Sequence, residues 1–275
     1  MSKGVLLFAN NNSQIDYVKQ ACYLAKKINK HLKVPVSLVT SDNKRVTDYY
    51  PYEVFDQIIE KKSKNNFSKR YNDGALSHKK LEFNNDLRPQ AYKLTPYDVT
   101  LMMDTDYIIC NDLFKNVFDT EHDLLLYKDS TDITLHRDFT EFKRISDTSI
   151  DFYWATCVVF KKTYFTKTFF ELIEHIRQEW VHYANVYQLS QRVYRNDYSF
   201  SIAVNLMDNH KIGSMPGKML YSTDKDVLFE VEEDKLKFLV EKKDRLGQYT
   251  AVYTDKLNVH VMNKFSLNRM IDGVM

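Results

Sequence analysis

The sequence predicts an α/β fold in which a mostly parallel central sheet is flanked by helices. A strand predicted over residues 4–9 is followed by a helix and by a second strand over residues 35–40. This strand–helix–strand order is typical of parallel sheets, because the crossover helix covers one face. The 275 residues include only 6 Gly and 5 Pro, so no flexible linker is evident. We expect a single domain over residues 1–275.

The first helix is predicted by apolar residues that recur at helical spacing, with lysines on the opposite face. These apolar residues are Ile15, Val18, Cys22, Ala25 and Ile28. Ser13 and Asp16 stand three residues apart before them and resemble a helix N-cap pair. Residues 56–59 predict a third strand.

Residues 61–90 break this pattern, because basic side chains stand among asparagines with few acids between them. The basic residues are Lys61, Lys62, Lys64, Lys69, Arg70, Lys79, Lys80 and Arg88. Two interpretations account for this composition equally well. One is a solvated loop that contains a helix, and the other is a surface that binds a series of phosphate groups.

The rest of the chain alternates apolar strands with two helices. Strands are predicted over residues 99–103, 123–127 and 152–160, a long helix over 169–183, a shorter buried helix over 199–207, and short strands up to 259–261. The long helix follows from an apolar stripe that begins at Phe169 and ends at Tyr183.

Composition excludes several classes of protein. A formal charge of +2 demands neither a nucleic acid nor a membrane partner. No apolar run approaches the roughly 20 residues that a membrane span requires. Cys22, Cys110 and Cys157 are odd in number, far apart and in apolar surroundings, so we expect reduced core residues. These observations favour a cytoplasmic protein without a membrane partner.

Asp104 and Asp106 are the most informative residues. They follow the apolar run 99–103, and side chains two positions apart on a strand point the same way. Carboxylates beside a buried strand need a partner, and a hard divalent cation provides one. We therefore predict a metal site here. The chain holds a second such pair, Asp224 and Asp226, in a more polar setting, and we interpret that pair as a solvated turn.

The loop after the first strand, residues 10–13, contains no glycine. A Rossmann dinucleotide fingerprint and a Walker loop are therefore both absent. The missing glycine-rich loop also counts against a sugar-nucleotide pyrophosphorylase. The remaining way to hold a diphosphate is a cation bound by carboxylates, with a lysine or arginine nearby.

Three features together resemble a GT-A fold glycosyltransferase of the glycogenin-like and galactosyltransferase-like group, family 8. They are the first strand with its helix, the Asp-Thr-Asp element at 104–106, and the segment His-Val-Met-Asn-Lys at 260–264. The resemblance spans the chain, and two of these motifs are specific. It implies that residues 1–110 form a Rossmann-like half that binds a nucleotide-sugar and that residues 111–275 form the acceptor-binding half.

The resemblance assigns His260 as a third metal ligand beside the two aspartates, and Lys264 as a contact to the diphosphate. The family's glycine between these residues, and the proline and tryptophan that follow, are missing, since Phe265 and Ser266 stand there. Because His260 lies between two valines, a histidine satisfied within a strand is the alternative.

The resemblance also implies donor contacts. Phe8, Ala9 and Asn10 match the strand end that receives the uracil base and ribose. Thr105 belongs to the Asp-Thr-Asp element, and Arg88 matches a basic residue that reaches the donor. Arg88 could instead be a loop residue that pairs with Asp86 or Glu82.

Asn196 and Asp197 resemble the pair that faces the reacting carbon, and Asp197 is the expected catalytic carboxylate. It could equally cap a helix that begins near Ser199. Trp154-Ala155-Thr156 stands where the family has Asn-Ala-Gly beside the donor sugar, so the sugar is not specified. Trp154 on an apolar strand is more often a core residue.

The implied reaction is transfer of a hexosyl or pentosyl group from a UDP-sugar to an acceptor hydroxyl. Two carboxylates and an imidazole suit Mn²⁺ or Mg²⁺ better than Zn²⁺. Residues 153–156 and 260–267 also resemble uncharacterised proteins of large tailed phages. That likeness implies host cytoplasm as the location and makes a modified base in DNA a candidate acceptor, with a protein or glycan as the alternative.

Two other classes stay open. A metal-dependent phosphohydrolase or nuclease also uses paired carboxylates, and Glu121 and Asp123 could supply the extra acids that a second metal requires. A non-catalytic module that binds sugar or nucleic acid is the third class.

Overall fold

The computed structural model describes residues 1–49, 54–63, 67–84, 86–189, 193–207 and 210–274. Its largest element is a seven-stranded sheet in the order β11-β8-β10-β6-β1-β2-β3. The strands are β11 (Ile212–Ser214), β8 (Leu124–Tyr127), β10 (Trp154–Lys161), β6 (Val99–Met103), β1 (Lys3–Ala9), β2 (Val36–Thr40) and β3 (Gln57–Glu60). All the strands predicted before residue 161 lie in this sheet.

The sheet is mostly parallel, as predicted. β1 pairs in parallel with β2 and β6, β2 with β3, and β11 with β8. β10 is antiparallel to both of its neighbours, so it alone runs against the other six strands. The predicted α/β fold class is confirmed.

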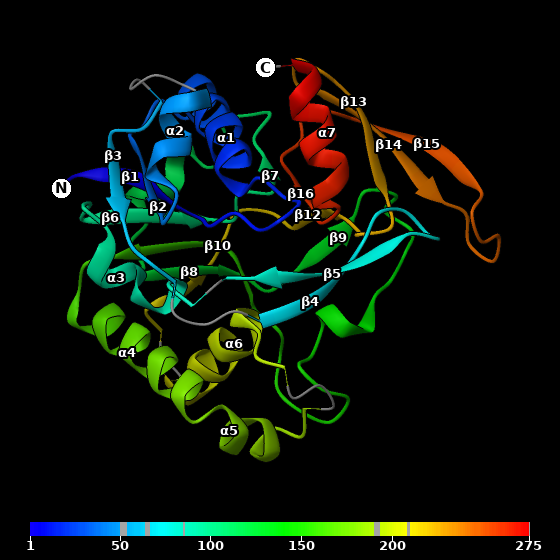
Figure 1. Cartoon of the computed structure of the whole chain (residues 1–275). Coiled ribbons are helices and arrows are strands. Elements are labelled where there is room, and N and C mark those ends of the chain that lie inside the picture. The colour runs from blue at the N-terminus through cyan, green and yellow to red at the C-terminus, as the bar shows by residue number, and fades with distance from the viewer. Residues whose placement is uncertain (50–53, 64–66, 85, 190–192, 208–209, 275) are drawn as a thin grey trace.

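Helices lie on both sides of the sheet (Figure 1). The helices of the described chain are α1 (Tyr17–His31), α2 (Asn43–Tyr49), α3 (Ala91–Leu94), α4 (Tyr164–Gln178), α5 (Trp180–Val186), α6 (Asn196–Met207) and α7 (Lys264–Val274), with short 3-10 turns η1 (Arg88–Gln90), η2 (Lys115–Asp119) and η3 (Thr140–Phe142). α1, α2 and α7 lie on one side, and α4, α5 and α6 on the other.

Three helix boundaries differ from the predictions. The N-cap of α1 is Asp16, whose carboxylate accepts a hydrogen bond from the Lys19 N–H at 3.0 Å, and Ser13 takes no part in the cap. The predicted long helix ends at Gln178 and α5 starts again at Trp180. α6 begins at Asn196, so Asp197 lies inside the first turn and does not precede the helix.

A second sheet, in the order β7-β16-β12-β9, packs beside the carboxyl end of the first. It contains β7 (Tyr107–Ile108), β16 (Val259–Val261), β12 (Met219–Ser222) and β9 (Ser130–Asp132). A three-stranded sheet follows from β13 (Val227–Glu232), β14 (Lys235–Glu241) and β15 (Tyr249–Asp255). These are the predicted short C-terminal strands, whereas α7 after them was not predicted.

The prediction of a loop that contains a helix is wrong for residues 67–83. They form an antiparallel hairpin, β4 (Phe67–Asn72) and β5 (His78–Phe83). Contacts at its tip hold these polar strands: Arg269 of α7 pairs with Asp73 through two 2.8 Å bonds, and the Tyr249 hydroxyl accepts from the Ala75 N–H. Lys64, one of the basic residues of this stretch, lies outside the described residues.

The three cysteines lie in the interior of the protein. Cys22, Cys110 and Cys157 are buried free thiols, as predicted. Within the described ranges, no helix combines the length and the apolar character that crossing a membrane requires.

Candidate metal and nucleotide site

The edge of the central sheet where the parallel strands end carries the candidate site. Because β1 and β6 are parallel neighbours, Asn10 and Asp104 leave the sheet at the same edge. The Asp104 N–H donates to the Thr156 carbonyl at 2.8 Å, which fixes the turn after β6 to the antiparallel strand β10. The predicted carboxylates therefore stand at the ligand-binding edge of an α/β sheet.

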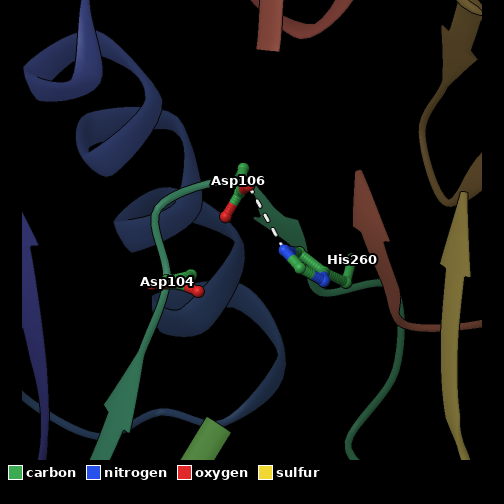
Figure 2. A group of neighbouring side chains, drawn as sticks. All are labelled: Asp104, Asp106 and His260. Atoms are coloured by element: carbon green, nitrogen blue, oxygen red, sulfur yellow. Dashed lines mark hydrogen bonds and ion pairs between the residues drawn. The ribbon is translucent and has the colours of Figure 1, made fainter. Parts of the chain in front are cut away.

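His260 reaches the same place from the far end of the chain. β16 pairs with β7 so that His260 lies opposite Tyr107, and the Val261 N–H donates to the Asp106 carbonyl at 2.8 Å. The His260 Nε2 lies 3.2 Å from Asp106 Oδ2 (Figure 2). One ligand atom from each of Asp104, Asp106 and His260 falls within 4.8 Å of the others.

Lys264 is the first residue of α7, and its Nζ lies 2.5 Å from Asp106 Oδ2. The Asp106 side chain is only 4% exposed. Burial opposes its ionisation, but Lys264 and His260 hold the pKa of Asp106 well below its usual range. In return, Asp106 raises the pKa of Lys264 despite burial. This carboxylate is therefore ionised and prepared to bind a cation.

Arg88 approaches the other carboxylate from η1. Its Nη1 lies 2.8 Å from Asp104 Oδ1, so the predicted alternatives, pairing with Asp86 or Glu82, are not adopted. Arg88 is buried, and its Nε and Nη2 have no hydrogen-bond partner among the described residues. Burial raises the pKa of Asp104, and Asp106 adds to this effect against the opposing Arg88. The two carboxylates thus differ in how readily they take up a proton.

The residues fit a divalent cation. Two carboxylates and one imidazole converge on one point. The Lys264 ammonium pairs with Asp106, so the site holds a positive charge beside this carboxylate. Oxygen-rich ligand sets of this kind favour Mg²⁺ or Mn²⁺. The buried His260 Nδ1 has no partner in the described part of the chain, so no second residue fixes the tautomer of the ring.

A cavity of about 1270 Å³ opens in front of this cluster. Of the predicted donor and catalytic residues, those with side chains on its lining are Phe8, Asn10, Arg88, Asp104, Thr105, Asn196, Asp197 and Lys264. Ala9 is buried in β1 and is not part of the lining. The Asn10 side chain accepts from the Ser41 N–H and hydroxyl, both at 2.9 Å, and so joins the loops after β1 and β2.

Asp197 is held at both oxygens on the far wall of the cavity. Its Oδ1 accepts from the Ala155 N–H and its Oδ2 pairs with Arg195, each at 3.0 Å. Asn196 accepts from the Tyr194 hydroxyl at 3.0 Å. The alternative that Asp197 caps a helix starting near Ser199 is wrong, because α6 begins before it.

Trp154 is a core residue, as the alternative interpretation had it. Its ring is 2% exposed and packs against Phe142, Tyr221 and the edge of His260. It nevertheless contributes to the cavity floor, and its Nε1 has no hydrogen-bond partner among the described residues.

The interpretation of Asp224 and Asp226 as a solvated turn is wrong for Asp226. This side chain is fully buried, and Arg137 binds it with two bonds of 2.9 and 2.7 Å. The Arg137 Nε also binds Asp132 at 2.5 Å. The sequence reasoning missed Arg137 because its partners lie five and 89 residues away.

Sequence reasoning also missed the inward face of the β4–β5 hairpin. The Tyr71 hydroxyl lies 3.1 Å from the hydroxyl of Tyr17 in α1, and Lys69 lines the cavity two residue pairs further along. The alternation of Leu81 and Phe83 is the one signal in the sequence that indicates a strand here.

The acids invoked for a nuclease lie elsewhere. Asp123 precedes β8, which runs in the same direction as β6, so Asp123 stands at the opposite edge of the sheet from Asp104. Its Oδ2 accepts from the Thr163 hydroxyl at 3.0 Å. Within the described ranges, the cluster of Asp104, Asp106 and His260 is the one group with metal-ligand spacing. The described residues therefore provide no second acidic cluster at this site.

Fold and site together define an α/β protein with a candidate divalent-cation site at the carboxyl edge of its sheet. No protein-family model matches the chain, and no curated protein matches its sequence. Solved structures to which the chain is similar include two proteins named as glycosyltransferases.

The first is the glycosyltransferase GlyE of Streptococcus pneumoniae TIGR4, at 13% identity and a TM-score of 0.45, over 78% of this chain and 45% of GlyE. The galactosyltransferase LgtC in complex with donor and acceptor sugar analogs gives 12% identity and a TM-score of 0.45, over 77% of this chain and 72% of LgtC. An active-site mutant of LgtC gives 12% and 0.47 over the same shares. This chain thus spans less than half of GlyE.

Proposed function

We propose that this chain is a metal-dependent glycosyltransferase that moves a hexosyl or pentosyl group from a UDP-sugar to an acceptor hydroxyl. The observation that carries the proposal is the convergence of Asp104, Asp106 and His260, with Lys264 against Asp106, at the carboxyl edge of a mostly parallel sheet. Mn²⁺ or Mg²⁺ would be held by these three ligands and would supply Lewis-acid stabilisation of the diphosphate.

The charges of the site suit a diphosphate. The carboxylates of Asp104 and Asp106 balance the cations of Arg88 and Lys264, which pair with them. A divalent cation adds two positive charges, and the diphosphate of a nucleotide-sugar carries two negative charges. Lys264 would then exchange its contact with Asp106 for one with phosphate oxygen, as a charge-assisted hydrogen bond.

The remaining residues take roles by position. Phe8 and Asn10, at the end of β1, would border the base and ribose, in keeping with a nucleotide-binding half over residues 1–110. Two buried nitrogens of Arg88, Nε and Nη2, have no hydrogen-bond partner among the described residues, and a donor phosphate would supply one. Asp197 would face the reacting carbon, with Asn196 beside it, and its fixed carboxylate would stabilise positive charge that develops on the sugar.

UDP release from a panel of UDP-sugars with Mn²⁺ tests the proposal. The wild type should release UDP from one sugar, chelation should stop it, and Asp106→Asn should remove it. Asp98→Asn is the matched control, because Asp98 precedes the same strand β6 at its other end and binds Ser2. Full activity in chelator would refute metal dependence, and absence of UDP release with every donor and acceptor would favour a non-catalytic binding module.

The acceptor proposal rests on cations at the cavity mouth. Five exposed basic side chains without a described carboxylate partner belong to the cavity lining, where the acids Asp224, Glu241 and Asp244 stand between them: Arg70, Lys225, Lys242, Lys243 and Arg245. A DNA strand that presents a modified base would place its phosphates along this lining. Arg88 was among the basic residues expected to contact phosphates of such a strand. It cannot do so, because it is buried against Asp104.

Salt dependence separates the acceptors. Transfer to DNA should fall steeply as salt rises, because each neutralised phosphate releases counterions. Transfer that is indifferent to salt would favour the alternative, a protein or glycan acceptor.

A further inference from the structure

Lys69 is an exposed cation on the cavity lining, and the proposed reaction has not yet used it. It lies on β4, in register with Leu81 of β5, and its side chain contributes to the cavity lining. In the described part of the chain no carboxylate lies within ion-pair distance of it. Its Nζ stands over the rings of Tyr71 and Phe83, at 5.8 and 5.5 Å from their centroids.

The charged groups that act on Lys69 belong both to the candidate metal site, through Lys264 and Asp106, and to the Arg195–Asp197 pair. Partial desolvation at the cavity lining, together with the cations of Lys264 and Arg195, lowers the pKa of Lys69, against the weaker opposing effects of Asp197 and Asp106. A cation under repulsion from two neighbours and without its own anion is stabilised when a negative ligand arrives.

The charge that appears during sugar transfer supplies such a ligand. The bond from the anomeric carbon to the β-phosphate oxygen breaks, its electron pair stays on that oxygen, and the acceptor oxygen bonds to the carbon as its proton is released. The diphosphate passes from two negative charges in the UDP-sugar to three in UDP near pH 7.5. Arg88, Lys264 and a divalent cation against two aspartates balance only the first state.

We propose that Lys69 is a further catalytic residue whose ammonium contacts the β-phosphate of the leaving UDP and balances the third charge. This inference rests on the proposed function. A group that binds UDP more strongly than the donor lowers the barrier, because the interaction grows as the bond breaks.

Calorimetric binding of UDP and of UMP, each with Mg²⁺, tests the proposal. Lys69→Met should weaken UDP binding on the order of tenfold, the size of one charge-assisted contact, and leave UMP binding unchanged. Lys69→Arg should restore UDP binding. Lys80→Met is the matched control: it changes an exposed lysine on the opposite face of the same hairpin, and it should bind both nucleotides like the wild type.

The pH response gives a second readout. Because the pKa of Lys69 is lowered, the UDP affinity of the wild type should fall at a lower pH than an ordinary lysine would give, and Lys69→Arg should remove that fall. Equal UDP affinity in Lys69→Met and wild type would overturn the inference alone. A wild type that binds no UDP with Mg²⁺ would overturn the proposed function itself.

Discussion

Two Asp-x-Asp segments border the same cavity, and they differ in what surrounds the second aspartate. Asp106 meets Lys264 and a histidine, both at one oxygen, Oδ2. Asp226 accepts four bonds, two from Arg137 and two from Thr223, which occupy both of its oxygens. A guanidinium that binds a carboxylate at both oxygens leaves no place for a metal. The neighbours, and not the motif, decide which pair can hold a cation.

The largest expected difference between the two segments is in metal affinity. Asp106→Asn should lower Mn²⁺ affinity by at least about a hundredfold, because it removes a charged ligand. Asp226→Asn should change it less than about threefold, since Asp226 faces Arg137. Calorimetric titration with Mn²⁺ measures both, and a comparable loss in the two variants would erase the distinction.

Stability should show the reverse order. Asp226→Ala should lower the free energy of unfolding by about 3 kcal/mol, since it leaves the Arg137 guanidinium without its main partner beside buried Asp132. Asp106→Ala should cost less, about 1 kcal/mol, because it also removes the repulsion that Asp106 exerts on the neighbouring Asp104 carboxylate. Urea unfolding in chelator measures both values. If Asp106→Ala lowered the free energy of unfolding more than Asp226→Ala, the ion pair of Asp106 would be the one that stabilises the fold.

The smallest expected effect is on pH dependence. Burial raises the pKa of Asp104, so protons compete with the metal at higher pH than at an ordinary carboxylate. From neutral to mildly acidic pH, Mn²⁺ affinity should therefore decline severalfold, and more gently in Asp104→Asn. Titration at three pH values in that window measures the slopes. If Mn²⁺ affinity changed equally with pH in the wild type and in Asp104→Asn, protonation of Asp104 would not be the cause of the decline.

The strands of the central sheet were predictable because each is a local apolar run. Residues 99–103 are fully buried, and their sequence alone indicates burial on both faces. Asp104 and Asp106 were found because this run ends just before them, but they lie in the turn between β6 and β7, so alternation along a strand is not what brings them together. His260 required a family resemblance, because nothing in residues 259–261 indicates pairing with β7.

The parts that were not predictable depend on contacts between distant segments. The β4–β5 hairpin is polar, and its tip is held by Arg269 and Tyr249. Asp226 looks like a solvated turn until Arg137 is placed beside it. α7 begins directly after β16, with Lys264 at its start, and its N-terminal residues carry no strong start signal.

The pairing of His260 with Asp106 spans 154 residues of chain, and this has a consequence for how the protein folds. Contacts of such long range form late, because closing the loop costs chain entropy before the contact is made. The strands β1, β2 and β6 can thus pair while His260 is still apart from Asp106. A metal ion that bound only the assembled trio would stabilise the folded state over states in which these residues are apart.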